Sequence, residues 1–419
     1  MSISTLLKGI PIPSLIHVRY TFKGNSQCDF KQVLNEQIIN KGLLHNIKPG
    51  ANIGITAGSR GIANLPAIIK EVAQKVKQAG ATPFIFPAMG SHGGATAEGQ
   101  LQVLNKLGIT EDSISCKICS SMDTIQIGTT PSGLPVFMDQ YAWKSDGVIV
   151  INRVKPHTTF RGSHESGIIK MLVIGMGKQK GAEACHQLGF SNMAQNIEEI
   201  ARVVLASGKV LFGVGVVENP EHQICHLDTA YPQEFFDKDA DMLHLAWENL
   251  PKLPFDKVDV LVIDEIGKEI SGTGFDTNAV GRANAGKPKV TRITVLNLSN
   301  KTAGNGNGIG RADTTTKKVF ERFNFEETYP NAITSTAAES VKMPMVLDND
   351  ELAIKAAIKM SLIPNYSNIF FARIKNTSDL ENIYVSKALF ETLKFNANIK
   401  VIGNNFKRII FNNEGNIIN

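Results

Sequence analysis

The sequence predicts an α/β protein with two α/β domains and mostly parallel sheets. The chain of 419 residues is too long for one ordinary hydrophobic core. Its first ~150 residues alternate strand-like and helix-like patterns, which is typical of βαβ units and a parallel sheet. Prolines recur from residue 220 to residue 254, and a fresh buried-strand pattern begins at 258–267. We therefore expect an N-terminal domain at 1–250 and a C-terminal domain at 251–419.

Composition and charge fit a soluble globular protein that binds small molecules. Hydrophobic residues make up 42% of the chain and charged residues 20%, and the net charge of +5 comes from 44 basic and 39 acidic residues. The sequence has no Lys/Arg run or basic–aromatic stripe, so we expect no nucleic-acid partner, whereas the mild positive charge suits small anionic ligands. The five cysteines form no even-numbered framework, and no apolar run approaches the ~20 residues of a membrane helix. We expect a reduced, cytoplasmic protein without a membrane partner, and the oligomeric state stays open.

The first strand and helix can be placed from local patterns. The run ANIGITAG at 51–58 is apolar and ends at a glycine, which predicts a buried strand. A helix follows over 64–80, because Asn64 suits the N-cap, Pro66 suits the first turn and Gly80 suits the C-terminal stop. Its predicted buried stripe consists of Leu65, Ile68, Ile69, Val72 and Val76.

The same alternation continues along the chain. Further strands are predicted at 81–90, 147–153, 209–218, 258–267, 289–299 and 368–374, and further helices at 96–108 and 191–208. Ser191 suits the N-cap of the last helix and Gly208 its stop. The final stretch RIIFNNEGNIIN is expected to form a terminal strand or hairpin.

The loops that follow the predicted strands are rich in glycine and polar residues. Open α/β sheets bind ligands just beyond the carboxyl ends of their strands, so these loops are the candidate site. TAGSRG follows the first strand, and Arg60 offers a planar, bidentate donor for phosphate or carboxylate beside a helix N-terminus. A surface arginine in a strand–helix turn is the alternative explanation.

Three histidines and one lysine occupy the next two of these loops. His92 lies in GSHGG, and His157 follows Pro156 in KPH. Lys170 lies in the apolar stretch SGIIKMLVIGMG, where desolvation would lower its pKa and make the amine a nucleophile, although a lysine extending from a strand to solvent is the simpler explanation. His186 lies in a short predicted helix, KGAEACHQLG. The four together favour a functional site.

These residues resemble a known family. Ser-Arg after a strand, GSH after the next strand, KPH, a glycine-flanked lysine and then ACH, in this order, resemble the nickel-dependent lactate racemase (LarA-like) family. The resemblance implies two α/β domains with the active site in the interdomain cleft. It also implies the family cofactor, the nickel pincer nucleotide (pyridinium-3,5-bisthiocarboxylic acid mononucleotide with Ni).

The resemblance further implies a role for each matched residue. Lys170 would form a thioamide with the cofactor, and His186 would be the protein ligand of nickel. His92 and His157 would act as acid/base groups. Ser59 and Arg60 would bind the cofactor, with Arg60 also near the substrate.

The chemistry of 2-hydroxy acid racemisation calls for the same set. Hydrogen must leave the carbon and return to either face, and the hydroxyl then occupies two mirror-related positions. Two bases are therefore needed, one for each enantiomer, and histidine has a suitable pKa. Side chains cannot accept a hydride, so a cofactor is required. Nickel accepts imidazole in a square-planar ligand set.

Departures from the family pattern concern the substrate. The loop between His157 and Lys170 is longer and carries His164 and Glu165, and glycines follow His92 where lactate racemases have Arg-Pro. The C-terminal loop IGKEISGTGFDTNAVGR differs from that of lactate racemases. We expect a 2-hydroxy acid other than lactate, for example a larger one, to be racemised or epimerised, with contacts from four residues of that loop. Lys268 and Arg282 would bind the carboxylate, and Asp276 or Asn278 would orient hydroxyls.

Two other functions remain open. The histidines would also serve a zinc- or iron-dependent lyase or hydrolase, and the whole set would serve a non-catalytic protein that binds the nickel nucleotide. CKIC at 116–119 lacks the second pair that a zinc site needs. HQICH at 222–226 looks like a surface connection, and GNGNGIGRAD at 304–313 lacks the lysine of a phosphate-binding loop.

Overall fold

The structure, a computed structural model, describes residues 2–59, 61–187, 189–282 and 286–418. The chain forms two compact units, which we call the N-terminal unit (Gly24–Leu250) and the C-terminal unit (Met1–Lys23 and Pro251–Asn419). The expected domain of residues 1–250 differs from the N-terminal unit in its first residues. They belong to the C-terminal unit because β1 pairs with strands near the end of the chain.

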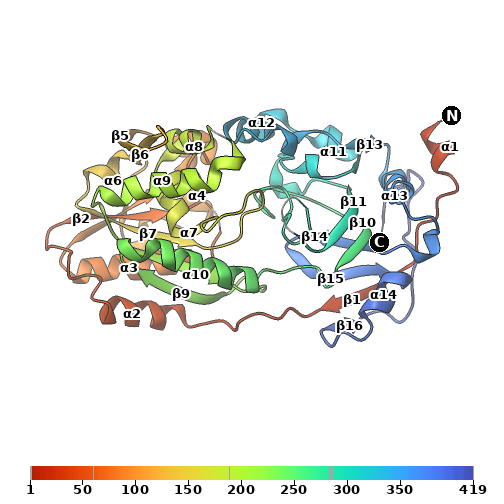
Figure 1. Ribbon diagram of the computed structural model, residues 1–419, viewed down its shortest axis with the longest axis horizontal. Coiled ribbons are helices and arrows are strands. Elements are labelled where there is room, and N and C mark those ends of the chain that lie inside the picture. Colours follow the sequence, from red (N-terminus) through yellow and green to blue (C-terminus); the bar gives the residue numbers. More distant parts are fainter. Residues whose placement is uncertain (1, 60, 188, 283–285, 419) are drawn as a thin grey trace. The chain divides into compact units, whose positions relative to one another are not determined.

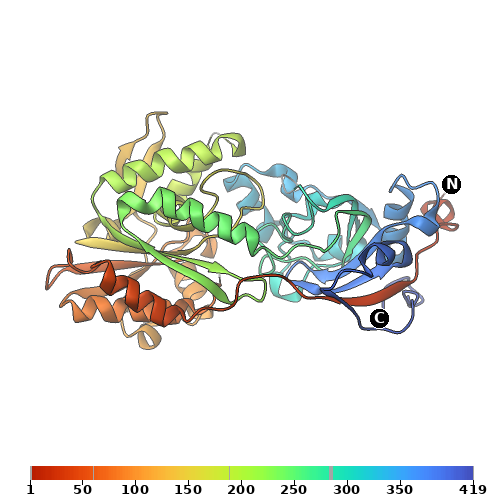
Figure 2. The same ribbon diagram turned by 60° about the horizontal axis from the view of Figure 1, so that its bottom comes forward.

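The N-terminal unit is a six-stranded sheet with helices on both faces (Figures 1 and 2). The strands of this sheet are β2 (Asn52–Ala57), β3 (Thr82–Pro87), β4 (Lys117–Ile118), β7 (Gly147–Arg153), β8 (Val210–Glu218) and β9 (Ile224–Ala230), and β5 (Thr124–Thr129) and β6 (Pro135–Asp139) form a separate antiparallel pair. Its α-helices are α2 (Phe30–Asn40), α3 (Leu65–Gln78), α4 (Ala97–Lys106), α5 (Glu111–Ile114), α6 (Gln140–Lys144), α7 (Gly167–Lys170), α8 (Lys178–His186), α9 (Met193–Ala206) and α10 (Phe235–Glu248). Its short helical turns are η1 (Gly93–Ala95), η2 (Met171–Gly175, a π-turn), η3 (Phe190–Asn192) and η4 (Pro232–Glu234).

The strand order is β4-β3-β2-β7-β8-β9, and every pair is parallel except β8 with β9. Alternate residues of β7 enter different cores: Ile149 and Ile151 pack with α2, α3 and α4, whereas Val148 and Val150 pack with α7, α9 and α10. The sheet is therefore buried on both faces, as expected for parallel strands. In Figure 2 the red-to-orange helices α2 and α3 lie across the sheet from the green helices α9 and α10.

Local patterns placed these elements well where an apolar period was clear. The predicted stripe of α3 is at most 2% exposed throughout. Asn64 does precede α3, but its side chain makes no capping hydrogen bond. The N-cap of α9 is Asn192 and not the predicted Ser191, because α9 begins at Met193.

The segment at 220–254 is not a simple connection. It contains β9, which extends the sheet as an antiparallel strand on β8, and α10, which buries Phe235 and Met242. Pro232 opens the helical turn before α10. Prolines thus mark the start of a helix here, because proline fits the first turn, where its missing N–H costs nothing.

The C-terminal unit contains an eight-stranded mixed sheet in the order β13-β12-β11-β10-β14-β15-β1-β16. Its strands are β1 (Leu15–Tyr20), β10 (Lys257–Ile263), β11 (Lys289–Val295), β12 (Thr314–Thr316), β13 (Met345–Leu347), β14 (Phe371–Asn376), β15 (Asp379–Ser386) and β16 (Ile399–Val401). Its helices are α1 (Ile3–Leu7), η5 (Asn300–Thr302), η6 (Ile309–Arg311), α11 (Lys317–Arg322), α12 (Phe325–Thr334), η7 (Ala338–Val341), α13 (Asp350–Lys359), η8 (Tyr366–Asn368) and α14 (Lys387–Leu393). The pairs from β13 to β14 are parallel and those from β14 to β16 antiparallel.

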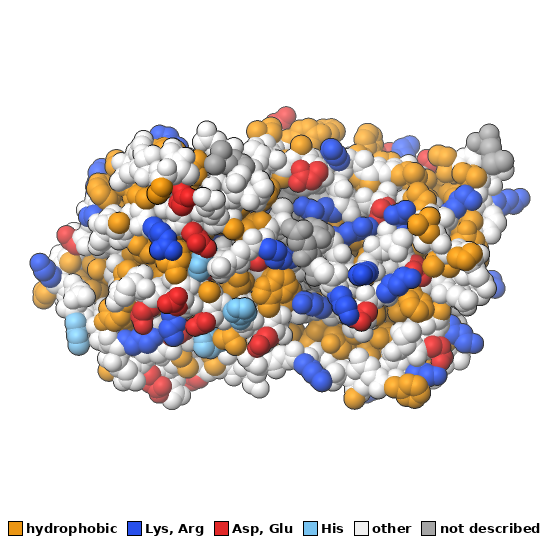
Figure 3. Space-filling model, in the orientation of Figure 1, with side chains coloured by type: hydrophobic (Ala, Val, Ile, Leu, Met, Phe, Trp, Pro, Cys, Tyr) orange, Lys and Arg blue, Asp and Glu red, His pale blue; other side chains and the backbone are white. Residues whose placement is uncertain are grey.

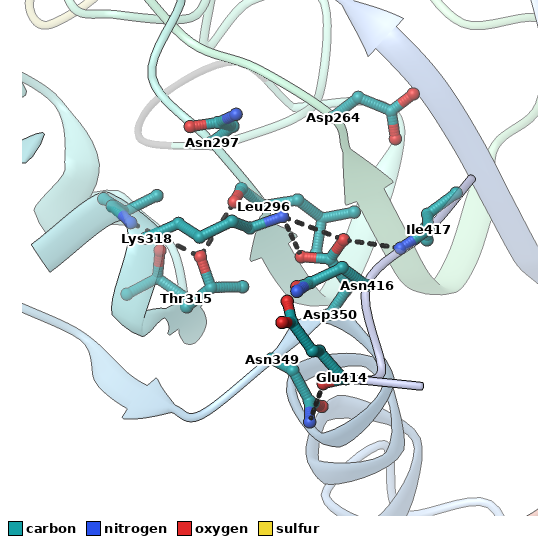
Figure 4. A network of polar contacts seen from close by, with 12 residues as sticks. Asp264, Leu296, Asn297, Thr315, Lys318, Asn349, Asp350, Glu414, Asn416 and Ile417 are labelled. Carbon is teal, nitrogen blue, oxygen red and sulfur yellow. Dashed lines mark hydrogen bonds and ion pairs between the residues drawn. The ribbon is translucent and has the colours of Figure 1, made fainter. Parts of the chain in front are cut away.

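The last residues fold back as a short hairpin with a bridge between Phe411 and Ile417. Asp350 at the start of α13 holds this hairpin, because its carboxylate accepts the backbone N–H of Ile417 at 2.9 Å and pairs with Lys318 at 2.8 Å (Figure 4). The α/β class with mostly parallel sheets is thus confirmed, and the expected terminal hairpin is present.

Candidate active site

The candidate site of the N-terminal unit lies at one edge of its sheet. Strands β3, β2 and β7 are neighbours and parallel, so their carboxyl ends share this edge. Ser59 follows β2, His92 follows β3 and His157 follows β7. Loops in this position bind the ligands of open α/β sheets. Arg60 lies outside the described residues.

Ser59 and His92 contact each other across two neighbouring loops. The hydroxyl of Ser59 lies within hydrogen-bond distance of Nδ1 of His92. Gln100 in α4 holds the His92 loop, because its amide donates to the carbonyls of Gly90 at 2.9 Å and His92 at 3.2 Å. The contact between Ser59 and His92 thereby joins the loops that follow β2 and β3.

His157 lies half-buried against an aromatic ring. Its imidazole is 4.5 Å from the ring of Phe160, centroid to centroid. The backbone N–H of Thr159 donates to Nδ1 of His157 at 3.1 Å. Because Nδ1 accepts this bond, the neutral ring carries its proton on Nε2.

Lys170 lies at the end of the short helix α7, and not on a strand as the simpler explanation of this lysine assumed. The ammonium group is 5.1 Å from the centroid of the Phe160 ring and donates to the carbonyl of Glu165 at 3.4 Å. The stretch around it is apolar, as expected, but helical, because Asp239 in α10 accepts the backbone N–H of Ile168 at 2.7 Å at the helix start. A partner so distant in the chain leaves no trace in the local pattern.

Glycine is required at the start of α7. Gly167 has φ +86°, and a Cβ there would lie 2.0 Å from Oδ1 of Asp239. Its carbonyl accepts from the side chain of Asn152, at the end of β7, at 2.7 Å. These contacts fix the direction in which α7 carries Lys170 toward the strand ends.

His186 is the last residue of α8, and one of its two ring nitrogens has a lone pair that could bind a metal. Its Nδ1 donates to the carbonyl of Ala182 at 2.7 Å, so Nε2 carries the lone pair. Burial lowers the pKa of His186, and the charge of Lys170 lowers it further. The ring of Phe190 packs edge-on against His186 at 5.6 Å and lies 6.4 Å from the ring of His157.

The two phenylalanine rings therefore gather three predicted residues: His157, Lys170 and His186. The thiol of Cys185, next to His186, faces away toward Met193 at 3.5 Å. Burial raises the pKa of Cys185 to about 12, so the thiol stays protonated and is a poor metal ligand.

A buried ion pair that the sequence patterns did not predict supports the site. Lys178 and Asp139 are fully buried and 3.1 Å apart. Lys178 also donates to the carbonyl of Pro87, at the end of β3, and to Gln100 at 3.0 Å. Burial lowers the pKa of Lys178 and raises that of Asp139, and their mutual attraction opposes both shifts. The pair supports the His92 loop through Gln100, and no local pattern in the sequence indicates it.

His164, which sequence analysis left without a role, is buried beneath α7. It lies 3.5 Å from Asp239 and 3.8 Å from Glu198, with the ring of Phe236 edge-on at 5.1 Å. Asp239 is the residue that caps α7. His164 therefore supports the helix that carries Lys170.

The substrate residues expected in the C-terminal unit have partners of their own. The amine of Lys268 donates to Asn331 at 2.5 Å, and Arg282 forms an ion pair with Asp313. Asp276 and Asn278 are buried and hydrogen-bond to each other, from the backbone N–H of Asn278 to Asp276 at 2.9 Å. Lys and Arg side chains are frequent on the face of the C-terminal unit drawn in Figure 3, a distribution that suits anionic ligands.

The cysteine and the second histidine of the HQICH motif are part of a strand. Cys225 and His226 lie in β9, where the thiol of Cys225 donates to the carbonyl of Val217 at 3.4 Å. Among the residues that the structure describes, no three His, Cys, Asp or Glu side chains gather as they would around a metal ion. Within the same ranges, no helix has the length and apolar character needed to cross a membrane.

An open parallel sheet with histidines and a lysine at its carboxyl edge is the architecture of an α/β enzyme that acts on a small ligand. Comparison with known families is more specific. Residues 20–198 match the model of the family described as the lactate racemase N-terminal domain. These residues form a domain of the lactate racemase-like (LarA-like) family, and they include all the predicted site residues of the N-terminal unit. The match supports a racemase-type isomerase.

Two solved structures are similar over much of their length. One is the lactate racemase apoprotein from Thermoanaerobacterium thermosaccharolyticum, 15% identical, covering 92% of this chain and 97% of that chain with a TM-score of 0.49. The other is a protein from Thermotoga maritima, 13% identical, covering 76% of this chain and 84% of that chain with the same TM-score of 0.49. Similarity at this level carries no conclusion about function. No curated protein matches the chain.

Proposed function

We propose that this protein is a cytoplasmic racemase or epimerase of a 2-hydroxy acid other than lactate, and that it works with the nickel pincer nucleotide. The observation that supports the proposal most strongly is the gathering of His157, Lys170 and His186 around two phenylalanine rings. It offers one acid/base group, one amine and one imidazole ligand within a single set of side chains.

His186 and Lys170 fit the attachment points that the nickel nucleotide needs. The proton on Nδ1 of His186 is held by the carbonyl of Ala182, so Nε2 would bind nickel. The lowered pKa of His186 keeps the ring neutral, as a metal ligand must be. Lys170 would hold the nucleotide through its amine. When bound, the nucleotide would supply the hydride acceptor that side chains lack.

His92 and His157 would exchange the hydroxyl proton of the two enantiomers. In both rings Nδ1 faces the protein, toward Ser59 in His92 and toward the backbone N–H of Thr159 in His157. We therefore assign proton exchange to Nε2 of each ring. One histidine would take the proton from one enantiomer, and the other would return it to form the mirror image.

Anion-binding roles complete the proposal. Ser59 and Arg60 would bind the nucleotide, with Arg60 near its phosphate. Lys268 and Arg282 would bind the substrate carboxylate. Because Arg282 pairs with Asp313, its guanidinium would have to bind the carboxylates of Asp313 and of the substrate together.

Intact mass and metal content test the proposal directly. The protein is produced together with enzymes that make the nickel pincer nucleotide. We expect the wild type to carry a covalent adduct and stoichiometric nickel, and Lys170→Ala to carry no adduct. Lys180→Ala, in α8, is the matched control and keeps both. An unchanged adduct in Lys170→Ala would contradict the anchoring role.

Turnover separates the proposal from its alternatives. A panel of 2-hydroxy acids is incubated with the loaded protein and resolved by chiral chromatography. We expect wild type to interconvert at least one pair of isomers, and His92→Ala and His157→Ala to lose this activity. Stoichiometric zinc or iron without nickel would favour a metal-dependent lyase or hydrolase. Adduct and nickel without any turnover would favour a nucleotide-binding protein.

A further inference from the structure

Glu165 is a buried carboxylate to which the proposed function gives no role. Its side chain is 2% exposed, and burial raises its pKa. A buried carboxylate is costly unless hydrogen bonds and opposite charge compensate it, and an apolar residue would often serve stability as well. The contacts of Glu165 therefore indicate what the carboxylate is for.

The carboxylate of Glu165 holds the loop that carries His157. One oxygen accepts the backbone N–H of His157 at 2.7 Å, and the other accepts that of Gly162 at 3.3 Å. Arg161 lies 3.4 Å from the carboxylate and donates to the carbonyl of His157 at 2.6 Å. Both backbone polar groups of His157 are thus tied to the Glu165–Arg161 pair.

The backbone of Glu165 contacts a second residue of the site, Lys170. Its carbonyl accepts from the ammonium group of Lys170 at 3.4 Å. Phe160, which the same loop carries, packs against the imidazole of His157 at 4.5 Å and lies 5.1 Å from the amine of Lys170. One residue is therefore bonded to the backbone of His157 and to the side chain of Lys170.

We propose that Glu165 is a positioning residue that sets the placement of the His157 imidazole relative to the Lys170 amine. The inference rests on the proposed function, in which Lys170 holds the cofactor and His157 exchanges the proton. Loss of the carboxylate would release the backbone of His157, while the loop would stay attached at its ends. Loss of the negative charge alone, with an oxygen acceptor kept, would disturb His157 less.

Two variants of Glu165 and one matched control test this inference. Glu165→Ala removes the acceptor, and Glu165→Gln keeps an amide oxygen that can accept the N–H of His157. Asp350→Ala is the control, because Asp350 is also 2% exposed, accepts one backbone N–H and pairs with a cation, but lies in the C-terminal unit (Figure 4). Amide hydrogen exchange of the apoprotein is measured first, then kcat and KM of the loaded protein.

We expect Glu165→Ala to lose exchange protection at His157 and Gly162 while α9 keeps it. In the loaded protein kcat should fall about a hundredfold, as small misplacements of reacting groups do, with KM little changed. Glu165→Gln should recover kcat to within about tenfold of wild type, because a neutral hydrogen bond replaces a charged one. Asp350→Ala should lose protection at Ile417 and keep kcat.

Some outcomes would overturn the inference. Wild-type exchange at His157 in Glu165→Ala would show that the carboxylate does not hold this loop. Equal kcat in Glu165→Ala and wild type, with the loop released, would show that positioning does not matter. If the wild type itself forms no adduct and turns nothing over, the proposed function fails, and the positioning role that rests on it fails with it. The exchange data would still show whether Glu165 holds the loop.

Discussion

Breaking the buried Lys178–Asp139 pair should cost the N-terminal unit much of its stability. Lys178→Met replaces the cation by an apolar side chain of similar length and leaves the Asp139 carboxylate buried, where it accepts the backbone N–H groups of Tyr141 and Ala142 at 2.7 and 3.1 Å. Removing one member of such a pair typically costs about 3–5 kcal/mol. Replacing both members, as in Lys178→Met/Asp139→Asn, should cost clearly less than the two single changes added together.

Tryptophan fluorescence during urea unfolding measures this effect in the right part of the molecule. Both tryptophans of the chain, Trp143 and Trp247, lie in the N-terminal unit. Amide exchange at His92 provides a second measurement, because Lys178 supports the His92 loop through Gln100. Single-variant costs below about 1 kcal/mol, or costs that simply add in the double variant, would refute the argument that a buried charge is left uncompensated.

Three further predictions concern single sites. Gly167→Ala should destabilise the N-terminal unit by more than about 1 kcal/mol in urea unfolding, because its φ is +86° and the new Cβ would meet Asp239; an unchanged midpoint would contradict this. Cys185 should resist iodoacetamide at about pH 8 in the folded protein and react after unfolding, because burial raises the pKa of its thiol to about 12; rapid native labelling seen by peptide mass would show that it is accessible. Burial raises the pKa of Asp264, so its contribution to stability is present at low pH and is lost as the pH rises through that raised pKa; relative to wild type, Asp264→Asn should therefore gain stability between about pH 4 and pH 7 in thermal unfolding, and a trend in the other direction would refute the sign.

Sequence patterns predicted the fold best where burial repeats locally. The stripe of α3 and the bounds of β7 follow from runs of apolar residues whose spacing matches the element. The same rule assigns no element to the stretch around Lys170, because a short apolar run does not distinguish a strand from a buried helix. The deciding contact, from Asp239 to the start of α7, joins residues far apart in the chain.

Sequence patterns single out the residues of the candidate site, whose roles stay predictions, but they do not indicate the buried residues that hold the site in place. His92, His157, Lys170 and His186 stand out because polar residues follow predicted strands. Glu165 and the Lys178–Asp139 pair were missed as supports, since charged residues are expected at the surface and only the folded chain brings their partners to them.

The pairing of β1 with β15 and β16 has a consequence for the order in which the chain folds during synthesis. β1 leaves the ribosome before the N-terminal unit, whereas its partners leave after that unit. The N-terminal unit, a continuous segment, can therefore fold while β1 is still an unpaired strand. A chain that stops before β15 would contain a finished N-terminal unit and an unpaired β1, whose free backbone N–H and C=O groups make prematurely terminated products prone to association.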